Sequence, residues 1–135
     1  MSDVEKLHHY TCLAGLILFT VYFFLPYVWF EIYSVGTAVM LGFDGEGAFY
    51  QLSTFQVYIW GVIYIISLVG LLRFHQGARI LFVFLMIVEL VQPFLFGAQV
   101  TSNLDGALNY LLNMIDGMLF VLIFFTPVSM RFRDA

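Results

Sequence analysis

The stretch ARILFVFLMIVELVQPFLFG, residues 78–97, decides the fold of this chain. It is an apolar run of about the 20 residues that an α-helix needs to cross the roughly 30 Å hydrocarbon core of a bilayer. Glu89, Gln92 and Pro93 interrupt it. A charge at the centre of a bilayer costs at least about 2.5 kcal/mol on insertion scales, so Glu89 marks a candidate functional site whose partner has to be found.

The composition of the whole chain agrees with this stretch. Of its 135 residues, 62% are hydrophobic and 10% are charged, whereas about 25% of the residues of a soluble domain are charged. Apolar runs of spanning length recur, which predicts one transmembrane domain, residues 1–135, with an all-α fold. We expect an integral membrane four-helix bundle running up-down-up-down, with spans at about 9–30, 54–72, 79–98 and 104–126.

The charges predict an orientation. All the basic residues fall on one side of the four-span arrangement: Lys6, Arg73, Arg79, Arg131 and Arg133. The charged residues on the other side are all acidic: Glu31, Asp44, Glu46 and Asp105. Because basic residues near span ends stay in the cytoplasm, we expect a multi-pass protein of the inner (plasma) membrane with both termini cytoplasmic. The net charge of -4 and the scattered basic residues predict no nucleic-acid partner.

The first span and the segment after it leave some questions open. Residues 1–7 are polar and are expected to be a short mobile leader, and the apolar run that follows is too long for a secretory signal, so we expect it to be retained. The outer loop, residues 31–53, contains the turn sequence GFDGEG at 42–47. Its flanks are compatible with a short hairpin or with a helix lying in the membrane interface.

Two carboxyls fall at similar depth in the third and fourth predicted spans. At 1.5 Å per residue, Glu89 lies about 15 Å from Arg79 and Asp116 lies about 16 Å from Pro127. Helices joined by a short link pack side by side, so we expect the two acids to meet. Two acids in a low dielectric tend to share one proton rather than both ionise.

Other polar residues recur at helical spacing around these acids, which predicts an outward-facing polar pocket among the last three spans. Its predicted intramembrane site consists of Glu89, Asp116, Gln92, Asn109, Asn113 and Gln99. The second span adds a stripe that could line the pocket: Gln56, Trp60, Tyr64 and Ser67. The opposing interpretation is structural, because intramembrane amides and neutral carboxyls also act as hydrogen-bonding contacts between helices.

Several chemistries lack their minimum residues. Cys12 is the only cysteine, which excludes an internal disulfide and a thiolate-rich metal site. His8, His9 and His75 all fall at the cytoplasmic boundary, so we expect no haem between facing helices and no metal site. The sequence contains no G-x-S-x-G, H-E-x-x-H or P-loop motif. We therefore expect no cofactor and no catalytic residues.

Three functions remain in order of preference. The first is an accessory or interaction subunit, either a component of a larger membrane complex or an immunity-type protein, acting through its polar stripe and outer loop within the lipid bilayer. The alternative is a small proton-coupled transporter or binding protein with its pocket at Glu89 and Asp116. The third is an enzyme that acts on a lipid or quinone with the two acids as general acid and base, and it has the least support in the sequence.

Overall fold

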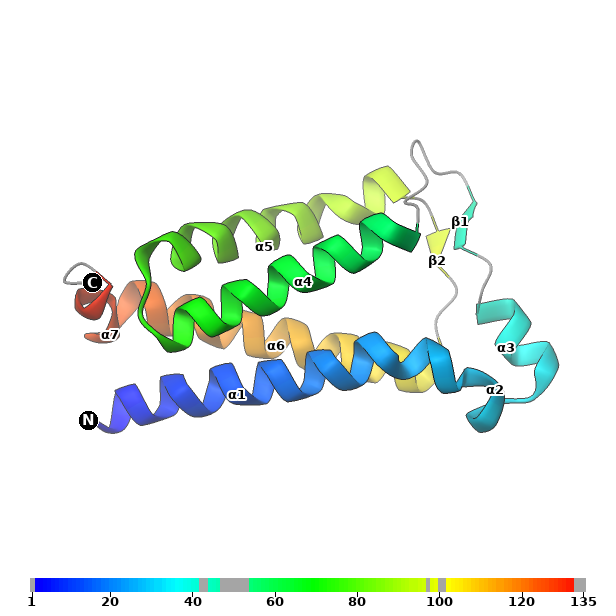
Figure 1. Ribbon diagram of the computed structural model, residues 1–135, viewed down its shortest axis with the longest axis horizontal. Helices are drawn as coiled ribbons and strands as arrows, with labels where there is room; N and C mark the ends of the chain where they lie inside the picture. Colours follow the sequence, from blue (N-terminus) through cyan, green and yellow to red (C-terminus); the bar gives the residue numbers. More distant parts are fainter. Residues whose placement is uncertain (1, 42–43, 47–53, 97, 100–101, 133–135) are drawn as a thin grey trace.

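Long antiparallel helices form this molecule, whose computed structural model describes residues 2–41, 44–46, 54–96, 98–99 and 102–132. The long helices are α1 (Asp3–Phe24), α4 (Thr54–Leu72), α5 (Gln76–Phe96) and α6 (Asn103–Phe125). They lie side by side, and successive ones run in opposite directions (Figure 1). Both chain termini and the α4–α5 link therefore share one end, which we call the terminal end. The other end is the loop end.

The predicted all-α class is confirmed, since the described chain is helical apart from one pair of short strands. Within the described residues, three segments are long and apolar enough to cross a membrane: Asp3–Ile32, Phe55–Leu72 and Asn103–Phe125. The 21-residue α5 occupies the position of the predicted third span.

Helix α1 begins earlier than predicted. The Ser2 hydroxyl accepts a hydrogen bond from the Glu5 backbone N–H, and the Glu5 carboxylate accepts one from the Ser2 N–H at 2.7 Å. This reciprocal capping box satisfies two of the free donors at the helix start. The prediction that residues 1–7 form a mobile leader is therefore wrong, because the helix already starts at Asp3.

The far end of the first segment changes its winding at Pro26. A 3-10 turn, η1 (Leu25–Val28), follows α1 and leads into the short helix α2 (Trp29–Ile32). Proline has no N–H to donate and clashes with the carbonyl four residues back, which explains why the α-helix stops here.

The first loop is helical on one flank and extended at its turn. Helix α3 (Val35–Leu41) lies on the first flank of the turn, for which the sequence is compatible with either a hairpin or a helix. Strand β1 (Asp44–Glu46) pairs antiparallel with β2 (Ala98–Gln99), across the loop end. The first loop is thus joined to the α5–α6 connection. The other flank of the predicted hairpin, residues 48–52, lies outside the described residues.

The α4–α5 link is a tight helix ending. The N–H of Phe74 donates to the Leu71 carbonyl at 3.0 Å, and the N–H of His75 donates to the Gly70 carbonyl at 2.9 Å, the double pattern of a Schellman motif. Phe74 adopts a positive φ of 57°, a conformation that costs a bulky residue on the order of 1 kcal/mol or more. The Phe74 ring packs against two other rings, with its centroid 5.1 Å from that of His8 and 5.5 Å from that of Phe132.

The apolar core occupies the terminal half of the molecule. Its buried residues come from α1, α4, α5, α6 and the C-terminal helix α7 (Val128–Arg131) with the residue after it: Cys12, Leu68, Leu71, Ala78, Phe82, Leu119, Ile123, Val128 and Phe132. At its edge, the Arg131 Nε donates to the Glu5 carboxylate at 2.7 Å and ties α7 to the start of α1. The molecule is therefore tightly packed at one end.

Candidate functional site

A buried carboxyl lies at the centre of the candidate site. Asp116 of α6 is only 4% exposed, and its Oδ1 accepts a hydrogen bond of 2.6 Å from the Tyr64 hydroxyl of α4. The Tyr64 ring packs on Phe19 of α1 with ring centroids 4.4 Å apart. Hydrogen bonds to a carboxylate are stronger than those between neutral groups. Asp116 is therefore held by Tyr64 of α4, whose ring in turn packs on α1.

A second polar cluster fixes the start of α6. The Ser102 hydroxyl caps the helix and hydrogen-bonds the Asp105 carboxylate, which also accepts from the Trp29 indole N–H at 3.4 Å. The Tyr33 hydroxyl bonds Ser102 at 2.7 Å. These contacts hold α6 against α2 and set the rotation of α6 about its axis. The sequence pattern did not connect Trp29 and Tyr33 to the start of α6.

Glu89 does not hydrogen-bond Asp116. Its side chain is exposed on α5, although it lies near enough to Asp116 and Tyr64 to interact with both electrostatically. At 1.5 Å per residue, Glu89 stands about 20 Å along α5 from Gln76. The expected direct meeting of the two acids is replaced by a Tyr64–Asp116 bond with Glu89 beside it.

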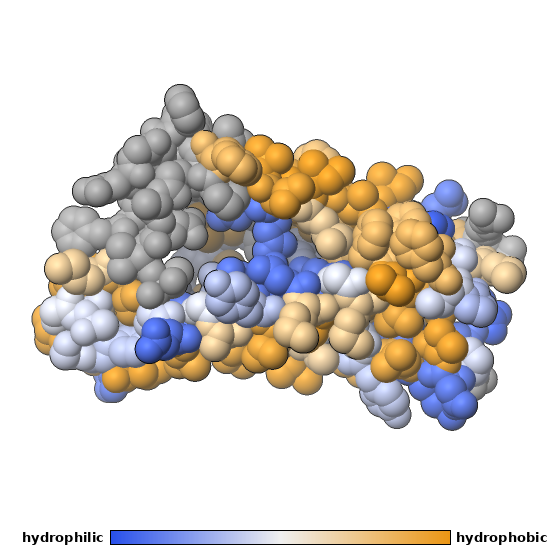
Figure 2. Space-filling model, turned by 180° about the vertical axis from the view of Figure 1, so that it is seen from behind, coloured by the Kyte–Doolittle hydropathy of each residue, from blue (hydrophilic) through white to orange (hydrophobic). Residues whose placement is uncertain are grey.

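An open hollow lies on the face of the molecule formed by α5 and α6. Figure 2 shows the hollow on the face where these two helices lie next to each other, with hydrophilic residues inside it and an apolar ridge above it. Asn113 is exposed and Asn109 is half-buried on α6, and Gln92 is half-buried on α5. Asn113 lies about 18 Å along α6 from Phe125, which matches the level of Glu89 on α5.

One small residue, Gly117, belongs to the same face and was not included in the predicted site. It is exposed one turn from Asn113, and a Cβ added there would meet nothing within 4 Å. The spacing could have placed Gly117 at the site, since positions 113 and 117 share a helix face. The sequence does not distinguish an exposed glycine from a packed one, however, and the structure does.

The predicted α4 stripe divides in two. Trp60 and Gln56 are half-buried near the loop end, whereas Ser67 is fully buried one turn beyond Tyr64. Within the described chain, the Ser67 hydroxyl oxygen is buried without a hydrogen-bond partner. Of Gln99 the structure places only the backbone, in β2. Tyr64, between these two groups, contacts the predicted acid Asp116.

The histidines lie apart from this site. His8 is fully buried in the terminal half, stacked on Phe74, and its Nε2 lies 3.7 Å from the Cys12 sulfur. Among the described residues, no group of three or more His, Cys, Asp or Glu side chains could hold a metal ion. His8 lies in the terminal half, and its burial comes from packing against Phe74 and Phe132.

The Tyr64→Phe variant should destabilise the protein by about 1–3 kcal/mol, because the buried Asp116 would lose its hydrogen-bond donor and keep its desolvation cost. Unfolding of the purified protein with rising SDS in mixed micelles measures this. Tyr110→Phe is the matched control, because Tyr110 on the same helix as Asp116 is 73% exposed. Equal midpoints for the two variants would show that the Tyr64 hydroxyl contributes nothing.

Comparison with known proteins returns no relative: no protein-family model, curated protein or solved structure matches this chain.

Proposed function

We propose that the chain is an inner-membrane protein of four spanning helices, α1, α4, α5 and α6, which binds a helix of a partner membrane protein at the α5–α6 face. Through this binding, the chain acts as an accessory or interaction subunit. Both termini lie in the cytoplasm in this proposal, since the terminal end carries Lys6, Arg73, Arg79 and Arg131. The shared position of the two termini is consistent with an even number of crossings (Figure 1).

The outer surface of the helices supports placement in lipid. Large apolar side chains project from it along the whole molecule, among them Ile17, Leu90 and Phe94. Exposed apolar area on this scale marks a membrane or protein interface. Acyl chains would cover it in a bilayer.

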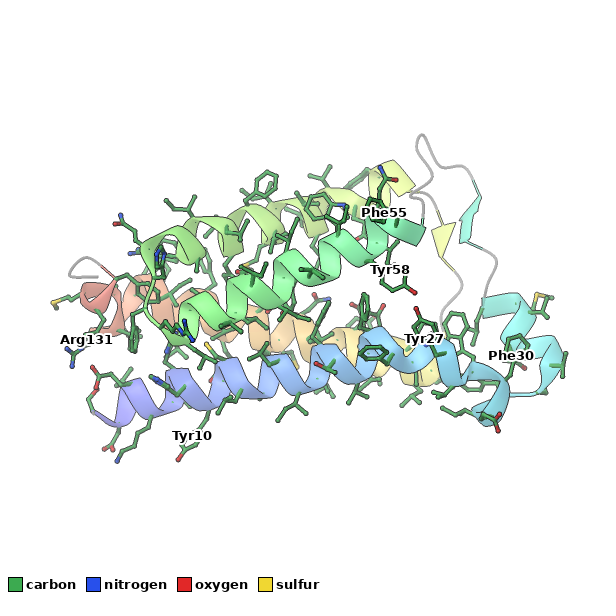
Figure 3. The ribbon with its side chains drawn as sticks, viewed as in Figure 1. Tyr10, Tyr27, Phe30, Phe55, Tyr58 and Arg131 are labelled. Carbon is green, nitrogen blue, oxygen red and sulfur yellow. The ribbon has the colours of Figure 1, made fainter. Side chains whose placement is uncertain are left out.

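Aromatic residues near both ends support the same placement, because Tyr and Trp favour the two membrane–water boundaries. Figure 3 shows exposed aromatic rings toward the loop end and a tyrosine with an arginine toward the terminal end: Tyr27, Phe30, Phe55 and Tyr58, then Tyr10 and Arg131. Tyr10 and Tyr27 are about 26 Å apart along the chain at 1.5 Å per residue, close to the thickness of a hydrocarbon core.

The observation that carries the interaction function is the exposure of Glu89 and Asn113 at one level near mid-membrane. Lipid offers no hydrogen bonds to either group, so each requires a partner within the membrane. Gly117 beside them lets another backbone approach closely, as small residues do at interfaces between membrane helices. The partner helix should present a cationic or amide donor to Glu89.

Site-specific photocrosslinking tests this function. A photoreactive side chain at position 117 should give an adduct with one defined polypeptide in native membranes, and Glu89→Leu should abolish the adduct. The same probe at position 17 of α1, which is exposed on another helix, should not give it. Adducts that are the same from both positions, or that survive Glu89→Leu, would count against a partner at this face.

A second function, a small proton-coupled transporter or binding protein, draws on the hollow and the buried Asp116. It predicts that Glu89→Gln abolishes proton movement into proteoliposomes, followed with an internal pH dye, while the protein stays folded and inserted. Unchanged proton flux in the Glu89→Gln variant would contradict the transporter function and would not affect the interaction function. An enzyme acting on a lipid or quinone has no observation that favours it.

A further inference from the structure

A cavity opens between α5 and α6 near the terminal end, away from the polar site. Its volume is about 280 Å³, and it is lined by Gln76, Arg79, Ile80, Val83 and Phe124. This volume is close to the lower limit of small-molecule sites, which is about 300 Å³. One end of the cavity is polar and the other is apolar.

Arg79 supplies a positive charge to the polar end, and no acid in the described part of the chain forms an ion pair with it. The ion pairs among the described residues join Lys6 to Asp3 and Arg131 to Glu5, so the two described acids of this end already have partners. Arg79 takes part in neither. It is half-buried, with its guanidinium carbon 4.0 Å from the centre of the Phe124 ring.

The stacking on Phe124 leaves the guanidinium able to bind an anion. All five N–H donors of an arginine lie in the plane of the group, whereas an aromatic ring occupies only its face. The planar fork fits two oxygens of a phosphate at once. Phe124 thus holds the guanidinium in place without neutralising its charge.

The apolar end extends away from this charge along α5. Val83 lies one turn beyond Arg79, about 6 Å further along the helix axis, and Ile80 is exposed beside it. In the proposed orientation this direction leads from the cytoplasmic surface into the acyl region. A charged end at the surface followed by apolar walls toward the bilayer matches a phospholipid rather than a free ion.

We propose that this cavity binds the phosphate head group of an anionic phospholipid, with Arg79 and Gln76 at the phosphate and Ile80 and Val83 along the acyl chain. Basic pockets between membrane helices on the cytoplasmic side recognise such head groups. The site rests on the membrane placement proposed above and is independent of the partner interface.

Native mass spectrometry of the purified protein tests the site. The probes are phosphatidylglycerol and phosphatidylcholine with identical acyl chains. We expect phosphatidylglycerol to be retained preferentially, and Arg79→Gln to lower its retention about fivefold. Val83→Phe, which fills the cavity without touching the charge, should lower it as well. Arg73→Gln is the matched control, because Arg73 is exposed at the same end but does not line the cavity.

Equal retention of the two lipids, an equal loss with Arg73→Gln, or full retention by Val83→Phe would each overturn the proposal. Displacement of phosphatidylglycerol by inorganic phosphate would also overturn it, since the apolar walls would then contribute nothing. Helical circular dichroism and an unchanged elution volume establish that each variant is folded. Loss of the lipid site with normal crosslinking at position 117 would leave the interaction function intact, and absence of the chain from membranes would remove both.

Discussion

Replacing Gly70 with alanine should lower the free energy of unfolding by about 1–3 kcal/mol, the cost of overpacking a close contact. A Cβ at Gly70 would overlap the Cβ of Ala78 across the α4–α5 pair. Both atoms are fixed to their backbones, so the helices themselves would have to separate. SDS unfolding followed by the fluorescence of Trp29 and Trp60 measures the change.

Two controls isolate this steric effect. Exchanging the residues in a Gly70→Ala, Ala78→Gly double variant restores the space and should recover most of the lost stability. Gly117→Ala should leave stability unchanged or raise it, because its Cβ would meet no atom within 4 Å and alanine favours a helix by about 1 kcal/mol over glycine. A double variant as unstable as Gly70→Ala would show that the overlap is not the cause.

Truncating Phe132 to alanine should cost about 3–5 kcal/mol, the usual range for a buried phenylalanine. Phe132 is fully buried and contacts the rings of His8 and Phe74. It follows α7 at the terminal end, where the unfolded chain meets water, so both the hydrophobic transfer energy and the packing are lost.

Phe125→Ala is the matched variant for Phe132→Ala. Phe125 ends α6 and is 76% exposed. Its removal leaves no internal cavity, so the free energy of unfolding should change by less than about 0.5 kcal/mol. The same SDS titration compares the two variants. Similar losses for both would mean that the cluster around His8 adds no stability.

Helix bounds followed from the sequence where polar residues mark both ends. Helix α4 runs from Thr54 to Leu72, as the hydrophobic pattern predicts, because the link that follows Leu72 is polar and short. The start of α1 was missed because residues 1–7 were judged by their polarity alone. Ser2 and Glu5 stand three residues apart, the spacing of a capping box, and this local signal predicts the observed start.

The sequence did not predict the pairing of side chains at the candidate site. Tyr64 and Asp116 were both identified by spacing, and the depth estimate placed Glu89 opposite Asp116. Depth along a helix says nothing of rotation about its axis, and this rotation decides that the Tyr64 hydroxyl bonds Asp116 while Glu89 lies beside them. The rotation of α6 depends on contacts such as Trp29 with Asp105, which join distant parts of the chain.

The pairing of α1 with the last elements of the chain has a consequence for biosynthesis. Helix α1 packs most extensively against α6, and Glu5 meets its partner only at Arg131. The α4–α5 hairpin, by contrast, is local and can form as soon as it emerges from the ribosome. The contacts of α1 with α4, such as the Phe19 ring on Tyr64, can therefore form once α4 is made, whereas its larger interface with α6 and the Glu5–Arg131 ion pair form only after those later elements are synthesised.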